Sequence, residues 1–152
     1  MKKKIALNPL EMLELKALGL SDENSSMFWL HINSAAAIIR RAAKSGMPFK
    51  PEEEISTEAT LFVGSDNIPE EATRAFGFQD ILNILPDKIN KDQKIGMDKS
   101  FKSVTISYTN PHSGRTPFMA VAPTALEAGY NILKLLLKYN HISGRFLIPS
   151  AE

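Results

Sequence analysis

Residues 101–139 read FKSVTISYTNPHSGRTPFMAVAPTALEAGYNILKLLLKY. Over 104–108, Val104, Ile106 and Tyr108 alternate with polar residues, which predicts a strand with one apolar and one hydroxylated face. Residues 109–116 contain Asn, Pro, Ser and Gly, the residue types that favour turns. The apolar run over 118–122 then predicts the return strand of a β-hairpin.

A helix over 125–139 follows this hairpin. Thr124 and Glu127 have the spacing of a capping box at its start. Apolar residues occupy most of its circumference: one stripe is Leu126, Tyr130, Leu133 and Leu137, and Ile132, Leu135 and Leu136 widen it. An apolar surface of this breadth predicts a largely buried helix packed on the hairpin.

A first helix is predicted near the N-terminus. Asn8 is a good N-cap, Pro9 suits the first helical position, and Glu11 completes a capping box. Gly19 is placed to end this helix. Four apolar residues fall on one side of it: Leu10, Leu13, Ala17 and Leu18.

The segment 25–45 lacks Pro and Gly and favours a single long helix. Apolar residues recur in it at helical spacing: Phe28, Ile32, Ala35, Ile39 and Ala42. A short strand over 27–32, followed by a helix over 35–44, is the alternative, because short apolar runs are ambiguous by period alone.

Further along, Thr60, Leu61, Phe62 and Val63 predict a strand over 58–63. Pro69 and two glutamates predict the start of a helix, which continues beyond Gly77 over 78–85. The residues 145–148 favour a final edge strand. The polar, lysine-rich segment 87–100 is the best candidate for a mobile loop.

Together these elements predict an α+β fold in one domain over 1–152. Its parts are N-terminal helices, a small, mostly antiparallel sheet that includes the C-terminal β-hairpin, and a buried C-terminal helix. Hydrophobic residues make up 43% and charged residues 23%, as is usual in globular domains. No stretch approaches the roughly 20 apolar residues of a membrane span, so no membrane association is expected.

The chain has no cysteine, which excludes disulfides, thiolate metal sites and cysteine nucleophiles and favours a reducing compartment. Asn8 and Pro9 interrupt the apolar run after the N-terminal lysines too early for a signal peptide. We therefore expect a cytoplasmic protein. Metal-binding, phosphate-loop and dinucleotide motifs are missing, so neither a metal nor a cofactor is predicted.

The most interesting polar cluster lies in the hairpin turn. His112, Ser113, Gly114 and Arg115 bring together an imidazole, a hydroxyl, a flexible backbone and a guanidinium. Such groups suit a phosphate or a carboxylate through charge-assisted hydrogen bonds. The contact surface that we predict consists of these four residues and the hydroxylated strand face, Ser103, Thr105 and Ser107.

Three functions are considered. The first is a non-catalytic binding protein, for which a protein partner is favoured over nucleic acid and a homo-oligomer is left open. The second is a small phosphoester-handling enzyme that uses His112 or His141 with Arg115 or Arg145. The third is nucleic-acid binding by the basic second half, since residues 88–152 hold 9 Lys and Arg against 4 Asp and Glu.

Overall fold

The computed structural model describes residues 4–31, 51–55, 59–64, 68 and 72–149. They form two compact units. The first unit comprises Met1–Leu13 and Asp22–Gly77, and the second comprises Glu14–Ser21 and Phe78–Glu152. Both contain an antiparallel sheet, and the α+β class is confirmed. One domain over 1–152 stays a prediction.

The first unit is built on a sheet with the strand order β2-β3-β1-β4. Its strands are β1 (Met27–His31), β2 (Pro51–Ile55), β3 (Ala59–Val63) and β4 (Thr73–Ala75), and all neighbours are antiparallel. The strand predicted over 58–63 is confirmed as β3. Phe28 of β1 and Phe62 of β3 are cross-strand partners, and their stacked rings have centroids 5.4 Å apart.

The long helix predicted over 25–45 is wrong for Met27–His31, which is strand β1; residues 32–50 lie outside the described part of the chain. The reason is that both faces of this strand are buried. Leu30 packs with Phe62 on one face, while Trp29 Nε1 donates to the carbonyl of Leu7 at 2.8 Å. A strand that is apolar on both faces has no alternation to distinguish it from a helix.

The helix predicted from Pro69 onward is also wrong for residues 73–75. Thr73–Ala75 is strand β4 and pairs with β1, while 69–71 lie outside the described residues. The backbone instead becomes helical at Phe78, where α3 (Phe78–Ile84) begins. This agrees with the predicted helical segment after Gly77.

Helix α1 (Pro9–Ala17) confirms the first predicted helix. The Oδ1 atom of Asn8 accepts a hydrogen bond from the Glu11 backbone N–H at 2.8 Å, and Glu11 Oε1 accepts one from the Asn8 N–H at 2.9 Å. Both bonds of the capping box are therefore made. After the helix, Gly19 has a φ of 98°, a left-handed conformation that glycine adopts without steric cost.

The buried residues of α1 are Met12 and Leu15. The side that carries Leu10, Leu13 and Leu18 is exposed, with 74%, 63% and 41% of each residue accessible. Apolar spacing along a helix predicts which residues share a side, and tertiary packing then decides which side is covered.

The second unit contains a sheet with the strand order β5-β6-β7-β8. Its strands are β5 (Lys88–Ile89), β6 (Gln93–Lys99), β7 (Val104–Thr109) and β8 (Phe118–Ala122). The β7–β8 hairpin confirms the sequence prediction. The loop predicted over 87–100 is wrong, because most of this segment is β5 and β6. Most β6 residues are exposed, and Ile95 and Met97 are its only apolar residues, so pairing with β7 places this strand more than burial does.

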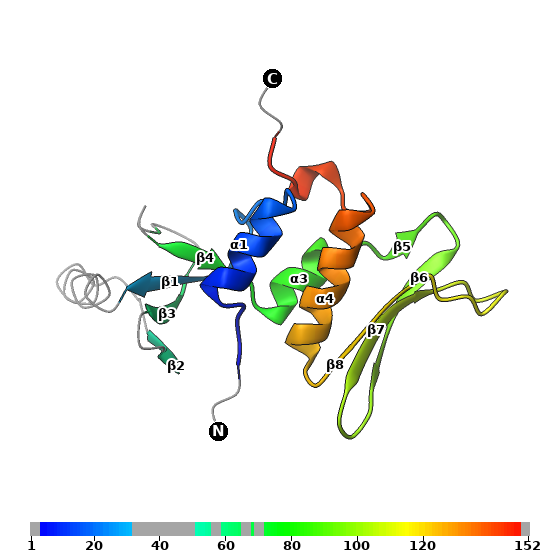
Figure 1. The fold of residues 1–152 in the computed structure, drawn as a ribbon, viewed down its shortest axis with the longest axis horizontal. Coiled ribbons are helices and arrows are strands. Elements are labelled where there is room, and N and C mark those ends of the chain that lie inside the picture. Colours follow the sequence, from blue (N-terminus) through cyan, green and yellow to red (C-terminus); the bar gives the residue numbers. More distant parts are fainter. Residues whose placement is uncertain (1–3, 32–50, 56–58, 65–67, 69–71, 150–152) are drawn as a thin grey trace. The chain divides into compact units, whose positions relative to one another are not determined.

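Helix α4 (Ala125–Lys138) packs on the face of this sheet formed by β7 and β8 (Figure 1). Its N-cap is Thr124, whose Oγ1 accepts from the Glu127 N–H at 3.2 Å. Eight of its residues are buried, which confirms the prediction of a buried C-terminal helix: Leu126, Ala128, Gly129, Tyr130, Ile132, Leu133, Leu136 and Leu137. The sheet residues on the same side are also buried: Val104, Ile106, Tyr108, Ala120 and Ala122.

The edge strand predicted over 145–148 is wrong. Gly144–Phe146 forms a 3₁₀ helix, and only a single bridge joins Leu20 and Leu147. Two backbone hydrogen bonds flank this bridge, each 2.8 Å long, from Ser21 N to Phe146 O and from Ile148 N to Gly19 O. Pairing is therefore present, but it is too short to form a strand.

Within the second unit, Glu14 of α1 is held by two residues of α4. The hydroxyl of Tyr130 donates to Glu14 Oε2, and Lys134 Nζ lies 3.4 Å from Glu14 Oε1. The hydrogen bond from Tyr130, assisted by the charge of Lys134, lowers the pKa of Glu14 below its ordinary value. A carboxylate with a lowered pKa stabilises the fold above its unfolded pKa, and this contribution is lost as the pH falls through the folded pKa.

We therefore expect Glu14→Gln to reduce stability at pH 7 and to make stability less dependent on pH below about 4.5. Urea denaturation midpoints at pH 7 and pH 3 measure this difference. Asp98→Asn, on the exposed part of β6, removes the same charge and serves as the control. An equal pH dependence in Glu14→Gln and the unmodified chain would contradict the assignment.

Candidate binding surface

The second sheet has a face that points away from α4, which we call the open face. On β7 it carries Thr105, Ser107 and Thr109, which alternate with the buried residues of that strand. Thr105 and Ser107 are two of the predicted contact residues and do share this face. Ser103 precedes β7 and lies in the turn after β6, where its Oγ is 2.9 Å from Ser100 Oγ.

The open face also has an apolar side. In the register between β7 and β8, Met119 lies opposite Ser107 and Val121 lies opposite Thr105. These two residues are 57% and 53% exposed. Large apolar side chains beside a row of hydroxyls form a surface suited to mixed apolar and polar contacts.

At one end of this sheet is the β7–β8 turn, residues 110–117, which we call the tip. Asn110 organises it: Asn110 Oδ1 accepts hydrogen bonds from the backbone N–H groups of His112 at 2.8 Å and Ser113 at 3.2 Å. The Gly114 N–H donates to Asn110 O at 2.8 Å, and the Asn110 N–H donates to Arg115 O at 2.9 Å. Gly114 has a φ of 73°, which explains why glycine occurs there.

The tip therefore holds His112 and Arg115 on an internally hydrogen-bonded backbone. All four predicted tip residues, His112 to Arg115, are exposed. Within the part of the chain that the structure describes, no carboxylate forms an ion pair with Arg115. The guanidinium is therefore available to an external anion.

The predicted contact residues do not form one compact cluster. Ser103 lies just before β7 and the tip lies just after it, so the six residues of β7 separate them by about 20 Å. Thr105 and Ser107 lie between the two ends. The structure thus arranges the predicted residues as a strip along β7.

Two lysines that the sequence prediction did not single out belong to the tip end of this strip. Lys88 of β5 and Lys94 of β6 are directly opposite each other, and Lys94 is also opposite Thr109. Like charges opposite each other across strands repel, and in the described residues no acid forms an ion pair with either lysine. The excess of basic residues over 88–152 was the only sequence signal for this pair.

An aromatic cluster lies behind the tip. The ring of Phe118, the first residue of β8, has its centroid 5.0 Å from that of His141 and 5.7 Å from that of Tyr139. His141 is therefore placed near the base of the tip by its edge-on contact with Phe118. Phe118 is far from Tyr139 and His141 in the sequence, so the sequence alone did not indicate this contact.

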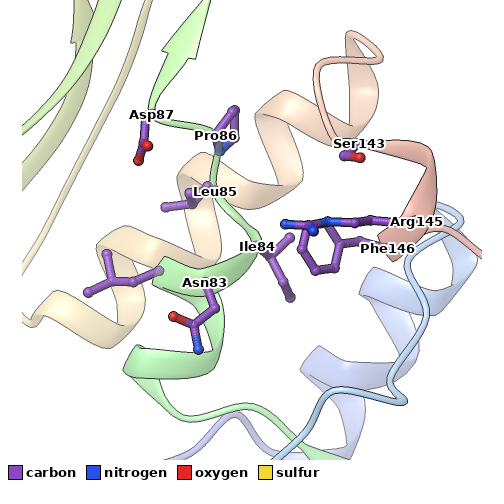
Figure 2. Close-up of a pocket in the computed structure, with 9 residues that line it drawn as sticks. Asn83, Ile84, Leu85, Pro86, Asp87, Ser143, Arg145 and Phe146 are labelled. Atoms are coloured by element: carbon purple, nitrogen blue, oxygen red, sulfur yellow. The ribbon is translucent and has the colours of Figure 1, made fainter.

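Arg145 lies elsewhere in the second unit, in a pocket of about 430 Å³ (Figure 2). Its guanidinium carbon is 4.5 Å from the centroid of the Phe146 ring. The lining comes from the end of α3 and from the 3₁₀ segment: Leu82, Asn83, Ile84, Leu85, Pro86, Asp87, Ser143, Arg145 and Phe146. No histidine lines this pocket, so it does not combine Arg145 with an imidazole.

Two further findings concern the described residues. No group of three or more His, Asp or Glu side chains comes together there as a metal site. None of the helices described is both long and apolar enough to cross a bilayer.

Fold and surface together define a class: an α+β protein with two antiparallel sheets, one of which has an open face and a structured hairpin tip. No protein-family model, curated protein or solved structure matches this chain. Its function must therefore be inferred from the surface itself.

Proposed function

We propose that this chain is a non-catalytic binding protein that engages a protein partner through the tip and the open face of the second sheet. The observation that carries the proposal is the tip, where hydrogen bonds to Asn110 hold the backbone beneath exposed His112 and Arg115. A loop that is ordered before binding loses less conformational entropy in the complex.

The charges and apolar residues on this surface suggest the chemistry of the partner. Arg115, Lys88 and Lys94 suit carboxylates, while Met119 and Val121 suit apolar side chains. A protein surface can offer both kinds of group together. A protein contacts a nucleic acid mainly at its phosphates and sugars. Such a partner would leave Met119 and Val121 without apolar contacts.

The proposal is tested with Arg115→Ala and His112→Ala in the full chain. A protein retained by the immobilised chain is purified and titrated against each variant by isothermal calorimetry. We expect the double variant to bind at least tenfold more weakly, which corresponds to about 1.4 kcal/mol, with an unchanged melting temperature. Lys102→Ala, an exposed site in the turn at the other end of β7, is the matched control. Unchanged affinity in the double variant would contradict the proposal.

A nucleic-acid partner is the second candidate, and the Lys88–Lys94 pair is the observation that favours it. It predicts that affinity for a mixed-sequence oligonucleotide falls steeply between 50 and 200 mM salt, as expected when counterions are released. A flat salt dependence would exclude it. No observation on this surface favours the phosphoester-handling enzyme, which stays a prediction from the sequence.

A further inference from the structure

The two edges of the second sheet differ in how they are protected from pairing with other strands. At one edge, β5 has only two residues and includes Lys88. Beyond β5, the exposed strand β6 carries Asp98 and Lys99. Short edge strands and charged side chains both discourage pairing with a further strand.

Strand β8 forms the other edge and has none of these features. Its sequence is FMAVA, with no charge and no proline within the strand. Its register with β7 is continuous from Phe118 to Ala122, so no bulge bends it away. No hydrogen bond from another described residue reaches its outer edge. An uncharged apolar edge without a bulge is a template for another strand.

We propose that β8 pairs with β8 of a second copy of this chain, antiparallel and about a two-fold axis at Ala120. In that register Met119 lies opposite the partner's Val121, and Phe118 lies opposite the partner's Ala122. Every cross-strand pair is apolar, and each large side chain faces a smaller one. The strand is therefore complementary to itself, as a two-fold interface requires.

The exposed side chains also favour a second copy as the occupant. Met119 and Val121 are each more than half exposed, and both lie on the open face. Self-pairing places Met119 beside the partner's Val121 at two symmetric positions, so each side chain shields one flank of the other. Because β8 has no charge, it offers nothing with which to select an acidic or basic peptide.

The pairing joins two four-stranded sheets. It uses Met119 and Val121, which also form the apolar part of the proposed partner surface, but it uses neither His112 nor Arg115 of the tip. Loss of partner binding in the His112 and Arg115 variant is therefore distinguishable from loss of dimerisation. Five residues from each copy bury less than the roughly 1,200 Å² of a stable standard interface. The dimer should therefore be weak, with a dissociation constant on the order of 10–100 µM.

Sedimentation velocity of the full chain between 5 µM and 1 mM tests the proposal. We expect the dimer fraction to rise with concentration. Met119→Lys combined with Val121→Lys places like charges opposite each other and should weaken dimerisation at least tenfold. Met119→Glu combined with Val121→Lys places opposite charges there and should dimerise at least tenfold more tightly than the double-lysine variant.

Met97→Lys is the matched control, because Met97 on β6 is 54% exposed, close to the value for Met119. It should leave dimerisation unchanged. Since all three substituted positions are exposed, circular dichroism should show a retained fold in every variant. A monomer at all concentrations, or a dimer that resists the double-lysine substitution, would overturn the proposal. A Glu–Lys variant that stays as weak as the double-lysine one would overturn the two-fold register.

The register has a second, independent test. The chain has no cysteine, so any introduced thiol is unique. An equimolar mixture of Met119→Cys and Val121→Cys chains should form a mixed disulfide under mild oxidation faster than either variant alone. Equal rates for the mixture and for each separate variant would contradict the register.

Discussion

Replacing Tyr108 by alanine should lower the free energy of unfolding of the second unit by about 3–5 kcal/mol. Tyr108 is fully buried on β7, and its hydroxyl donates to the Pro86 carbonyl at 2.6 Å. Truncation removes the aromatic ring from the interior of the unit and leaves the Pro86 oxygen without this donor. Urea denaturation of Tyr108→Ala and of the unmodified chain measures the difference.

Tyr108→Phe separates the contributions of the ring and the hydroxyl. This variant keeps the ring and should lower the free energy of unfolding by only about 1 kcal/mol, the net contribution of a typical hydrogen bond. Burial, with the nearby charge of Asp87, raises the pKa of Tyr108 well above its ordinary value. The raised pKa gives a stability contribution that is complete below the unfolded pKa of about 10 and declines as the pH rises further.

Between pH 9 and 11 the unmodified chain should therefore lose more stability than Tyr108→Phe. A loss of less than 1 kcal/mol in Tyr108→Ala at pH 7 would show that this ring is not part of the core. Equal pH dependence of the phenylalanine variant and the unmodified chain would contradict the buried position of the hydroxyl.

Gly129→Leu should destabilise the second unit by about 3 kcal/mol. Gly129 lies in α4 where α3 packs against it. A Cβ atom added at Gly129 would be 3.1 Å from Ile81 Cγ2 and 3.4 Å from the Phe78 ring. The larger side chain cannot fit unless α3 moves away from α4. Thermal unfolding followed by circular dichroism measures the loss.

Gly129→Ala is the matched control for this effect. Alanine gains roughly 1 kcal/mol of helix propensity over glycine, and this gain opposes the tight contact with Ile81. The alanine variant should therefore remain within about 1 kcal/mol of the unmodified chain. If the leucine variant is as stable as the alanine variant, the close approach of α3 and α4 at this position is wrong.

The elements that were predicted correctly have strong local signals. The alternation of Val104, Ile106 and Tyr108 predicted β7, and the caps at Asn8 and Thr124 predicted the starts of α1 and α4. These signals depend on neighbours within a few residues, so they do not require knowledge of the rest of the fold. The turn-favouring residues of the tip are a local signal of the same kind.

The elements that were missed depend on long-range pairing. In β1 the four residues from Met27 to Leu30 are all buried, on both faces of the sheet, so the helical periodicity of this segment was misleading. Strand β6 has only a short apolar alternation, Ile95 and Met97 in a segment rich in charged residues, and its pairing with β7 explains its position. The same holds for the surface: Lys88 and Lys94 become neighbours only through the register of β5 and β6.

The sequence by itself determined the α+β class, the β7–β8 hairpin with its glycine-containing tip, and the capped helix α4, because periodicity, caps and turn residues act locally. Tertiary structure alone decided that β5 and β6 extend this hairpin and which of their residues lie opposite each other. It also decided that β8, with no charge to protect it, lies at an edge. The sequence of a segment does not show which distant segment it will pair with, because the backbone of any strand can supply the hydrogen bonds.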